Sequence, residues 1–182
     1  MYTKTMEIQS YNVEIADRFG ALAQEFCSLV DSASQKDRTT LLVEIYRVLP
    51  RLIHEAMCLP MIKTAEEDDE SEGQSSSRPR VRITEEKWGE LYHLLKEKLG
   101  DWDLYWQVFD PTTDKEAVCG TLADDIADIY RDLKEGLSLR EEHLAPPKDI
   151  IWSWRLLYYS HWGKHAIDAL LTIHFRLQET LE

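Results

Sequence analysis

The chain has 182 residues, of which 43% are hydrophobic and 30% charged, so it can bury a core and is not disordered as a whole. Its 7 glycines and 6 prolines supply little turn chemistry for the many short strands of a β-sandwich or barrel. The 34 acidic side chains outnumber the 21 basic ones, and the resulting charge of −13 repels phosphate backbones, which argues against nucleic acid as a partner.

The sequence predicts neither a targeting signal nor a pair of bonded cysteines. The first residues carry acidic side chains and no long apolar run, so we expect no secretory signal and no membrane contact. Cys27, Cys58 and Cys119 are far apart and form no C-x-x-C pair, which argues against disulfides and a thiolate zinc site. We expect all three to be small buried hydrophobic side chains in a cytoplasmic protein.

Apolar residues spaced three and four apart predict two helices, over residues 8–31 and 38–59. Pro50 interrupts the second helix. Because a mid-helix proline loses a backbone hydrogen bond, we expect a kink near residues 46–50 or a restart of the helix. The buried stripes are expected to be Ile15, Phe19, Leu22, Phe26 and Leu29, then Leu41, Ile45, Leu49, Leu52, Ala56 and Leu59.

Residues 63–82 differ in composition from the rest of the chain. Six acidic side chains are followed by three serines and then by Arg78, Arg80 and Arg82. With almost nothing apolar to bury, the segment is predicted to be a flexible, disordered loop within one domain, acidic at one end and basic at the other. A docking segment for a basic partner is the alternative interpretation.

Capping residues mark the helices of the second half. Thr84 is a suitable N-cap for a third helix, and Gly100 stands where a left-handed residue ends it. The segment 101–109 is short and rich in aromatic side chains, and we expect it to form one or two helical turns. Thr121 caps a fourth predicted helix over residues 122–137, which Gly136 is expected to end.

The last predicted helix begins after two prolines at 146–147 and continues to about residue 181. At 1.5 Å per residue it spans roughly 50 Å, with Gly163 in its interior. The sequence therefore predicts an all-α fold: a single-domain bundle of about five helices over residues 1–182, with a long C-terminal helix and the disordered acidic loop.

Four segments carry a likeness to known sequences: LPRL at 49–52, YWQVFDP at 105–111, GTLADDIADIYRDLK at 120–134 and HWGKHA at 161–166. On these segments the chain resembles a bacterial family of uncharacterised proteins, domain of unknown function 5063. The resemblance spans most of the chain and implies an all-helical, cytoplasmic, bacterial protein. It brings no activity, cofactor or catalytic residue with it.

Asp124, Asp125 and Asp128 match the D-D-x-x-D pattern with which isoprenoid synthases bind magnesium and diphosphate. The chain is short for that fold and has no second aspartate-rich helix, and early acidic residues also suit the helix dipole. We therefore interpret the pattern as capping and solvation. A helical wheel places Asp125 beside the core, Asp132 at the boundary and Asp128 further out.

The last predicted helix combines polar and aromatic side chains. One broad face is apolar and carries Ile151, Trp152, Leu156, Tyr159, Gly163, Ala166, Leu170 and Ile173. Since large side chains lie on nearly every side, we expect the helix to be central and its second face to form a partly enclosed candidate pocket. That second face carries Trp154, Tyr158, His161, His165, Asp168 and Thr172.

Within this pocket, His161, His165 and Asp168 place three potential metal ligands on one side of the helix. Asp125 or His54 from a neighbouring helix is a candidate fourth ligand. The alternative is a pair of neutral histidines that bond to carboxylates or backbone oxygens in a packed aromatic layer. Because H-x-x-x-H without another positioned ligand is a weak motif, the pattern favours the alternative without a metal.

Two further residues are candidates for polar roles. Arg155 lies in the apolar sector of the last helix, and an unpaired buried charge is costly, so we expect it to pair with an aspartate of the fourth helix. The candidates are Asp125, Asp128 and Asp132. Cys119, before a predicted helix start, is the only thiol in an activating position, although a structural role is favoured.

Two classes of function remain. The acidic charge and the absence of G-x-S-x-G, phosphate-loop and H-E-x-x-H motifs favour a non-enzymatic binding or interaction protein, for example an inhibitor of a basic toxin. The alternative is a small-molecule or metal-binding, hydrolase-like protein with its site between the fourth and last helices. There His161 and His165 are the ligands or proton carriers, with Asp168 and Asp125 as carboxylate partners. No cofactor is predicted, and the oligomeric state stays open.

Overall fold

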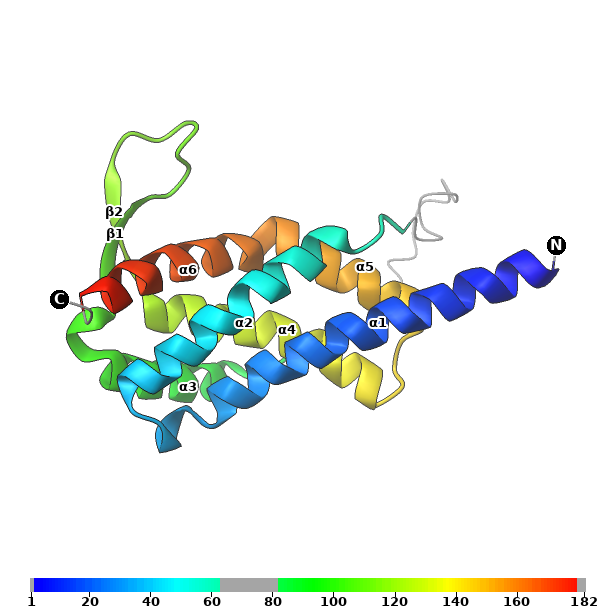
Figure 1. Ribbon diagram of the computed structural model, residues 1–182, viewed down its shortest axis with the longest axis horizontal. Coiled ribbons are helices and arrows are strands. Elements are labelled where there is room, and N and C mark those ends of the chain that lie inside the picture. Colours follow the sequence, from blue (N-terminus) through cyan, green and yellow to red (C-terminus); the bar gives the residue numbers. More distant parts are fainter. Residues whose placement is uncertain (1, 63–81, 180–182) are drawn as a thin grey trace.

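The computed structural model describes residues 2–62 and 82–179, which form an elongated helical bundle with one small hairpin (Figure 1). The predicted all-α class is confirmed, with a two-stranded sheet as an addition. The predicted loop lies outside the described residues except for its last residue, Arg82. In chain order the elements are α1 (Tyr2–Asp31), α2 (Arg38–Cys58), α3 (Glu85–Leu99), β1 (Leu104–Val108), β2 (Ala117–Thr121), α4 (Leu122–Glu141), α5 (Pro147–Leu157), a π-helical segment (Tyr158–Trp162) and α6 (Gly163–Gln178).

Helices α1 and α2 pack against each other through their predicted stripes. Phe19 and Phe26 of α1 and Leu41 and Leu52 of α2 are fully buried or nearly so. The side chain of Asp37 caps α2 by accepting a hydrogen bond from the backbone N–H of Thr40. Helix α2 continues through Pro50 to Cys58 without a restart.

Helix α4 is the centre of the bundle, since it packs against α1, α3, α5 and α6. Thr121 caps it as predicted, with its hydroxyl oxygen accepting from the N–H of Asp124. The predicted end at Gly136 is wrong, because α4 continues to Glu141. Gly136 instead lies in the interior of the helix, where the ring of Trp154 occupies the space of a side chain. The central position of α4 decides where the candidate site lies.

The predicted long C-terminal helix is confirmed as a continuous helical segment over residues 147–178, but it is not a regular α-helix throughout. Five residues, Tyr158–Trp162, adopt π-helical geometry between α5 and α6. A Cβ built on Gly163 would lie 2.3 Å from the carbonyl oxygen of Tyr158, so the wide turn requires glycine at this position. The wide turn takes up an extra residue, so different sequence positions share a face before and after it, and the face predicted for one regular helix is divided. Leu156 and Tyr159, which were expected in the apolar core face, are exposed.

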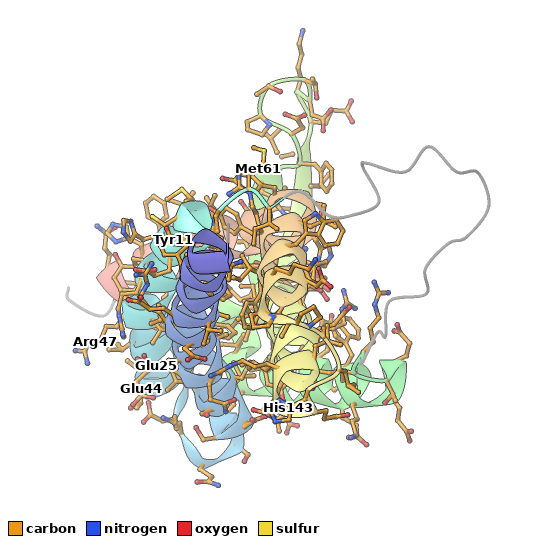
Figure 2. All side chains as sticks on the ribbon, turned by 90° about the vertical axis from the view of Figure 1, so that its right-hand side faces the viewer. Tyr11, Glu25, Glu44, Arg47, Met61 and His143 are labelled. Atoms are coloured by element: carbon orange, nitrogen blue, oxygen red, sulfur yellow. The ribbon has the colours of Figure 1, made fainter. Side chains whose placement is uncertain are left out.

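The aromatic segment after α3 forms a β-hairpin rather than the predicted helical turns. Gly100 ends α3 with a positive φ of 57°, as expected, and a short 3-10 turn, Gly100–Trp102, leads into β1. β1 pairs antiparallel with β2, and Leu104 lies opposite Thr121. Both views show the hairpin projecting beyond the helices (Figures 1 and 2). The exposed positions of β1 carry the apolar side chains Leu104 and Trp106, so the sequence lacks the polar–apolar alternation by which strands are predicted.

The burial predicted for the cysteines is confirmed for only one of the three. Cys27 is buried as expected, but Cys58 and Cys119 are exposed, so the prediction of three buried thiols is wrong. Cys119 lies in β2 rather than at a helix start. Among the described helices, none is both long and apolar enough to cross a membrane.

Candidate metal centre

Three of the four buried carboxylates of helix α4, Asp125, Asp128 and Asp132, are spaced three and four residues apart. Their exposed fractions are 3%, 7% and 6%. This spacing places all three on one side of the helix, facing the π segment and α6. The helical-wheel prediction that Asp128 points outward is therefore wrong. It assumed one buried face, whereas helices surround α4 on several sides.

Two histidines meet these carboxylates from the C-terminal segment. Nδ1 of His161, in the π segment, lies 2.7 Å from Oδ2 of Asp132. Nδ1 of His165, in α6, lies 2.8 Å from Oδ1 of Asp125. Each imidazole is thus held through one nitrogen by its own carboxylate, and the two ring centroids lie 5.0 Å apart.

The remaining nitrogen of each histidine is directed to Asp128. Its Oδ2 lies 3.5 Å from Nε2 of His161 and 3.6 Å from Nε2 of His165. Both separations are longer than an ordinary hydrogen bond. One potential ligand atom from each of the three residues lies within 4.8 Å of the others. The three side chains therefore face a shared space.

The second oxygen of Asp128 is fixed from the other side by two residues that the sequence analysis missed. Nε1 of Trp88, from α3, donates to Oδ1 at 2.8 Å, and Nη2 of Arg131 lies 2.8 Å from the same oxygen. The Arg131 guanidinium also lies 5.7 Å from the centre of the Trp88 ring. Asp128 thus has one oxygen held in place and one directed toward the histidines.

Tyr105 of β1 connects the hairpin to the same cluster. Its hydroxyl donates to Oδ2 of Asp125 at 2.7 Å, so both oxygens of this carboxylate are bonded. A Cβ on Gly120 would lie 2.7 Å from the Tyr105 ring, so glycine in β2 leaves the space through which the tyrosine reaches α4. The only signal for this residue was its place in the YWQVFDP string.

Comparisons with known proteins extend over nearly all of this structure. A model of the family described as "Domain of unknown function (DUF5063)" matches residues 11–178. The chain belongs to the DUF5063 family. It is also similar to the crystal structure of protein BF1032 from Bacteroides fragilis, with a TM-score of 0.68 and 23% identity over 86% of this chain and 87% of that one. At this identity the likeness shows the fold alone. No curated protein matches the chain.

Asp168, the predicted third ligand, is engaged elsewhere in this DUF5063 structure. Its Oδ2 accepts from Nζ of Lys164 at 2.5 Å, and the same Nζ donates to Oε1 of Gln107 at 2.7 Å. Asp128 of α4 takes the position that the sequence assigned to Asp168. His54, named as another ligand, is exposed and lies near Cys58 on α2.

Trp154 and Tyr158 belong to the core instead of to a polar pocket. Trp154 is fully buried, its Nε1 lies 3.4 Å from the carbonyl oxygen of Leu133, and its ring packs on Phe19. Tyr158 is buried against Trp162. Both assignments failed because the helical wheel assumes regular α-helical geometry through residues 158–162, which are π-helical.

Arg155 does not pair with the α4 carboxylates. Its Nη1 donates to the backbone carbonyl oxygen of Leu59 at 2.7 Å, and its guanidinium lies 4.8 Å from the ring centre of Tyr159. The prediction of a salt bridge to Asp125, Asp128 or Asp132 is wrong, and Arg131 on α4 itself supplies that charge.

Burial and mutual contact change the acidity of the cluster. Burial raises the pKa of Asp125 above its usual range, and the hydrogen bonds from His165 and Tyr105 only partly oppose this. Burial lowers the pKa of His165, but the bond to Asp125 and the nearby carboxylates outweigh it and raise the pKa overall. Burial and the carboxylate of Asp128 raise the pKa of Asp124. Asp124, Asp125 and His165 therefore hold protons more tightly than free side chains do.

Proposed function

We propose that Asp128, His161 and His165 bind one divalent metal ion, for which zinc is the best fit. The observation that carries the proposal is the direction of both Nε2 atoms toward one oxygen of Asp128, at 3.5 and 3.6 Å. Two histidines and one carboxylate, with further positions left for water, are typical ligands of catalytic zinc and non-haem iron.

The separation of the ligand atoms supports tetrahedral coordination. Atoms bound about 2.05 Å from a tetrahedral zinc ion lie ~3.4 Å apart, whereas neighbouring ligands of an octahedral ion lie ~3.0 Å apart. The separations of 3.5 and 3.6 Å are close to the tetrahedral value. All three ligand atoms lie within 4.8 Å of one another, so they face a space that an ion can share.

The outer contacts also match those of a metal centre. Metal-bound histidines donate their second N–H to a carboxylate or carbonyl, which fixes the tautomer and the ring orientation. Asp132 and Asp125 contact Nδ1 of His161 and His165 in this way. A second cluster, formed by Asp124, Asp125 and His165, fits less well because Tyr105 and His165 occupy both oxygens of Asp125.

A metal ion at this site would supply hydrolytic chemistry by lowering the pKa of a bound water molecule. The side chain of His161 is 36% exposed, so the cluster is open to solvent. The positive charge of Arg131, next to Asp128, lies where it can attract an anionic substrate. These features support a metal-dependent, hydrolase-like activity.

Cobalt and zinc titrations of the purified full-length chain test the proposal. We expect one ion per chain, with the visible absorption of tetrahedral Co²⁺ that zinc abolishes. His161→Gln, His165→Gln and Asp128→Asn should each remove this signal, because each removes a ligand. Asp168→Asn is the matched control and should bind as the wild type does, because Asp168 pairs with Lys164.

Two results would contradict the metal proposal. One is a wild-type chain that binds neither ion, which would leave a hydrogen-bonded histidine network without a metal. The other is loss of binding in Asp168→Asn together with full binding in Asp128→Asn, which would restore the ligand set expected from the sequence.

We also propose a second function, the binding of a basic protein partner. The charge of −13 supports it, because opposite charges accelerate encounter between proteins. Its specific structural support is the projecting hairpin, on which Leu104, Trp106, Phe109 and Val118 are exposed. Selection of peptides on the immobilised chain, described below, tests whether such binding exists.

A further inference from the structure

A groove of about 430 Å³ lies between β1 and the C-terminal half of α6. On the strand side it is lined by Trp106 and Val108, and on the helix side by Leu171 and Phe175. Trp106 is 75% exposed, and Leu171 and Phe175 are each 57% exposed. Large apolar side chains thus line both walls and remain open to solvent.

The hydrogen-bond register shows which edge of β1 faces this groove. The N–H of Leu122 donates to the carbonyl of Asp103 at 2.9 Å, one step before the paired residues Leu104 and Thr121. Because bonded and non-bonded pairs alternate in an antiparallel ladder, Tyr105 and Gln107 bond to β2, and the alternate residues of β1 direct their N–H and C=O groups outward.

A contact at one end of β1 confirms the direction of this outer edge. Nη2 of Arg176, in α6, donates to the carbonyl oxygen of Leu104 at 2.9 Å. The sheet has two strands, so within the described residues no strand covers the groups of Trp106 and Val108 further along. Such an edge pairs readily with an added strand.

We propose that this groove binds an extended segment of a protein partner, which adds to β1 as a third strand. The backbone of the segment would pair with the outward groups of Trp106 and Val108. Side chains of a strand alternate between its two faces, so every second one can contact Leu171 and Phe175. The segment therefore needs apolar residues at alternate positions.

The negative charge of the chain indicates which kind of partner segment the groove binds. The hairpin turn carries Asp110, Asp114 and Glu116 against one base, Lys115, and the whole chain carries −13. A segment with lysine or arginine between its apolar residues complements this charge, whereas a second copy of the chain is repelled. The inference rests on the second proposed function and specifies the surface and the form of its partner.

Selection from a random peptide library on the immobilised full-length chain, followed by affinity measurement, tests the groove. We expect peptides that alternate apolar residues with lysine or arginine. Val108→Pro should weaken their binding by about tenfold or more, because it removes an outward N–H without removing a β1–β2 bond. Cys119→Pro is the matched control, because it alters the outer edge of β2, and it should leave affinity within about twofold.

A second pair of variants leaves the strands unchanged and decides the question if Val108→Pro does not fold. Phe175→Arg, in the groove, should repel the basic peptides, whereas Ile167→Arg, exposed on α6 outside the groove, should not. If the peptides bound with equal affinity to both variants of each pair, the groove would not be their binding site, although partner binding itself would remain supported. Failure to select any peptide would reject partner binding itself, and dimerisation through β1 would show that a second copy occupies the edge.

Discussion

Gly136 and Trp154 lie so close that no side chain fits between them. A Cβ built on Gly136 would lie 2.0 Å from Nε1 of the indole, in the interior of α4. This close approach lets α5 pack directly onto the central helix and leaves Trp154 fully buried. The glycine is therefore a packing residue, although glycine disfavours a helix interior.

We predict that Gly136→Ala lowers the free energy of unfolding by about 1–3 kcal/mol, because the overlap with Trp154 outweighs the better helix propensity of alanine. Gly89→Ala is the matched control in α3, since a Cβ there meets nothing within 4 Å. It should stabilise the chain by up to about 1 kcal/mol. Chemical denaturation of both variants measures the difference, and a stabilising Gly136→Ala would contradict the packing geometry.

Gly163→Ala should disturb the π segment. The added Cβ would meet a backbone oxygen, that of Tyr158, which cannot move without a change in the local helix. We expect a loss of about 1–3 kcal/mol in the free energy of unfolding and a weaker signal in the Co²⁺ titration, because His161 lies within this segment. Unchanged stability and unchanged cobalt spectra together would show that the π geometry is not required.

Arg155→Leu should cost about 1 kcal/mol of stability through loss of the hydrogen bond to the Leu59 carbonyl. In a double-mutant cycle with Asp132→Asn the two effects should add, because Arg155 does not contact Asp132. The cycle between Arg131→Leu and Asp128→Asn should show coupling, since those side chains are 2.8 Å apart. Coupling in the first cycle would support the pairing that the sequence predicted.

The three thiols should differ in reactivity. Cys58 and Cys119 are exposed and should react with a thiol reagent in the native protein, whereas buried Cys27 should react only after unfolding. Counting modified thiols by mass spectrometry, before and after denaturation, checks this. Three rapidly modified thiols in the native chain would be inconsistent with the burial of Cys27.

Cys27 also predicts a loss of stability at alkaline pH. Burial raises the pKa of its thiol from 9.0 to about 12. The thiol stays neutral in the folded chain but ionises in the unfolded chain, so its contribution is complete below pH 9.0 and decreases as the pH rises toward 12. The slope is about 1.4 kcal/mol per pH unit in this window. Cys27→Ala should make the measured alkaline decrease shallower.

Helix boundaries could be predicted from the sequence where local chemistry determines them. Thr84, Thr121 and Gly100 end or begin helices as expected, because capping depends on neighbouring residues alone. The hairpin could not be predicted, because the exposed positions of β1 carry the apolar Leu104 and Trp106, so its sequence lacks the polar–apolar alternation of a half-buried strand. Its stability depends on tertiary contacts such as the bond from Tyr105 to Asp125.

The candidate site was also predictable only in part, because it too depends on tertiary contacts. His161 and His165 were named from helical spacing and Asp125 as a partner from a neighbouring helix, and the structure brings these three together. Asp168 has the right spacing, but Lys164, one turn earlier, pairs with it. Asp128 was assigned to solvent because the wheel does not show that helices surround α4 on several sides.

The π segment also has a consequence for how the chain tolerates insertions and deletions. A π turn takes up about one residue more than an α turn, so the five residues Tyr158–Trp162 rotate the chain about as far as four α-helical residues would. Removal of one of them, with closure to a regular α-helix, would leave Ala166 and Ala169 in the core and His165 near Asp125. Removal of a residue from α5 or α6 lacks this compensation and would turn the rest of α6 by about 100°.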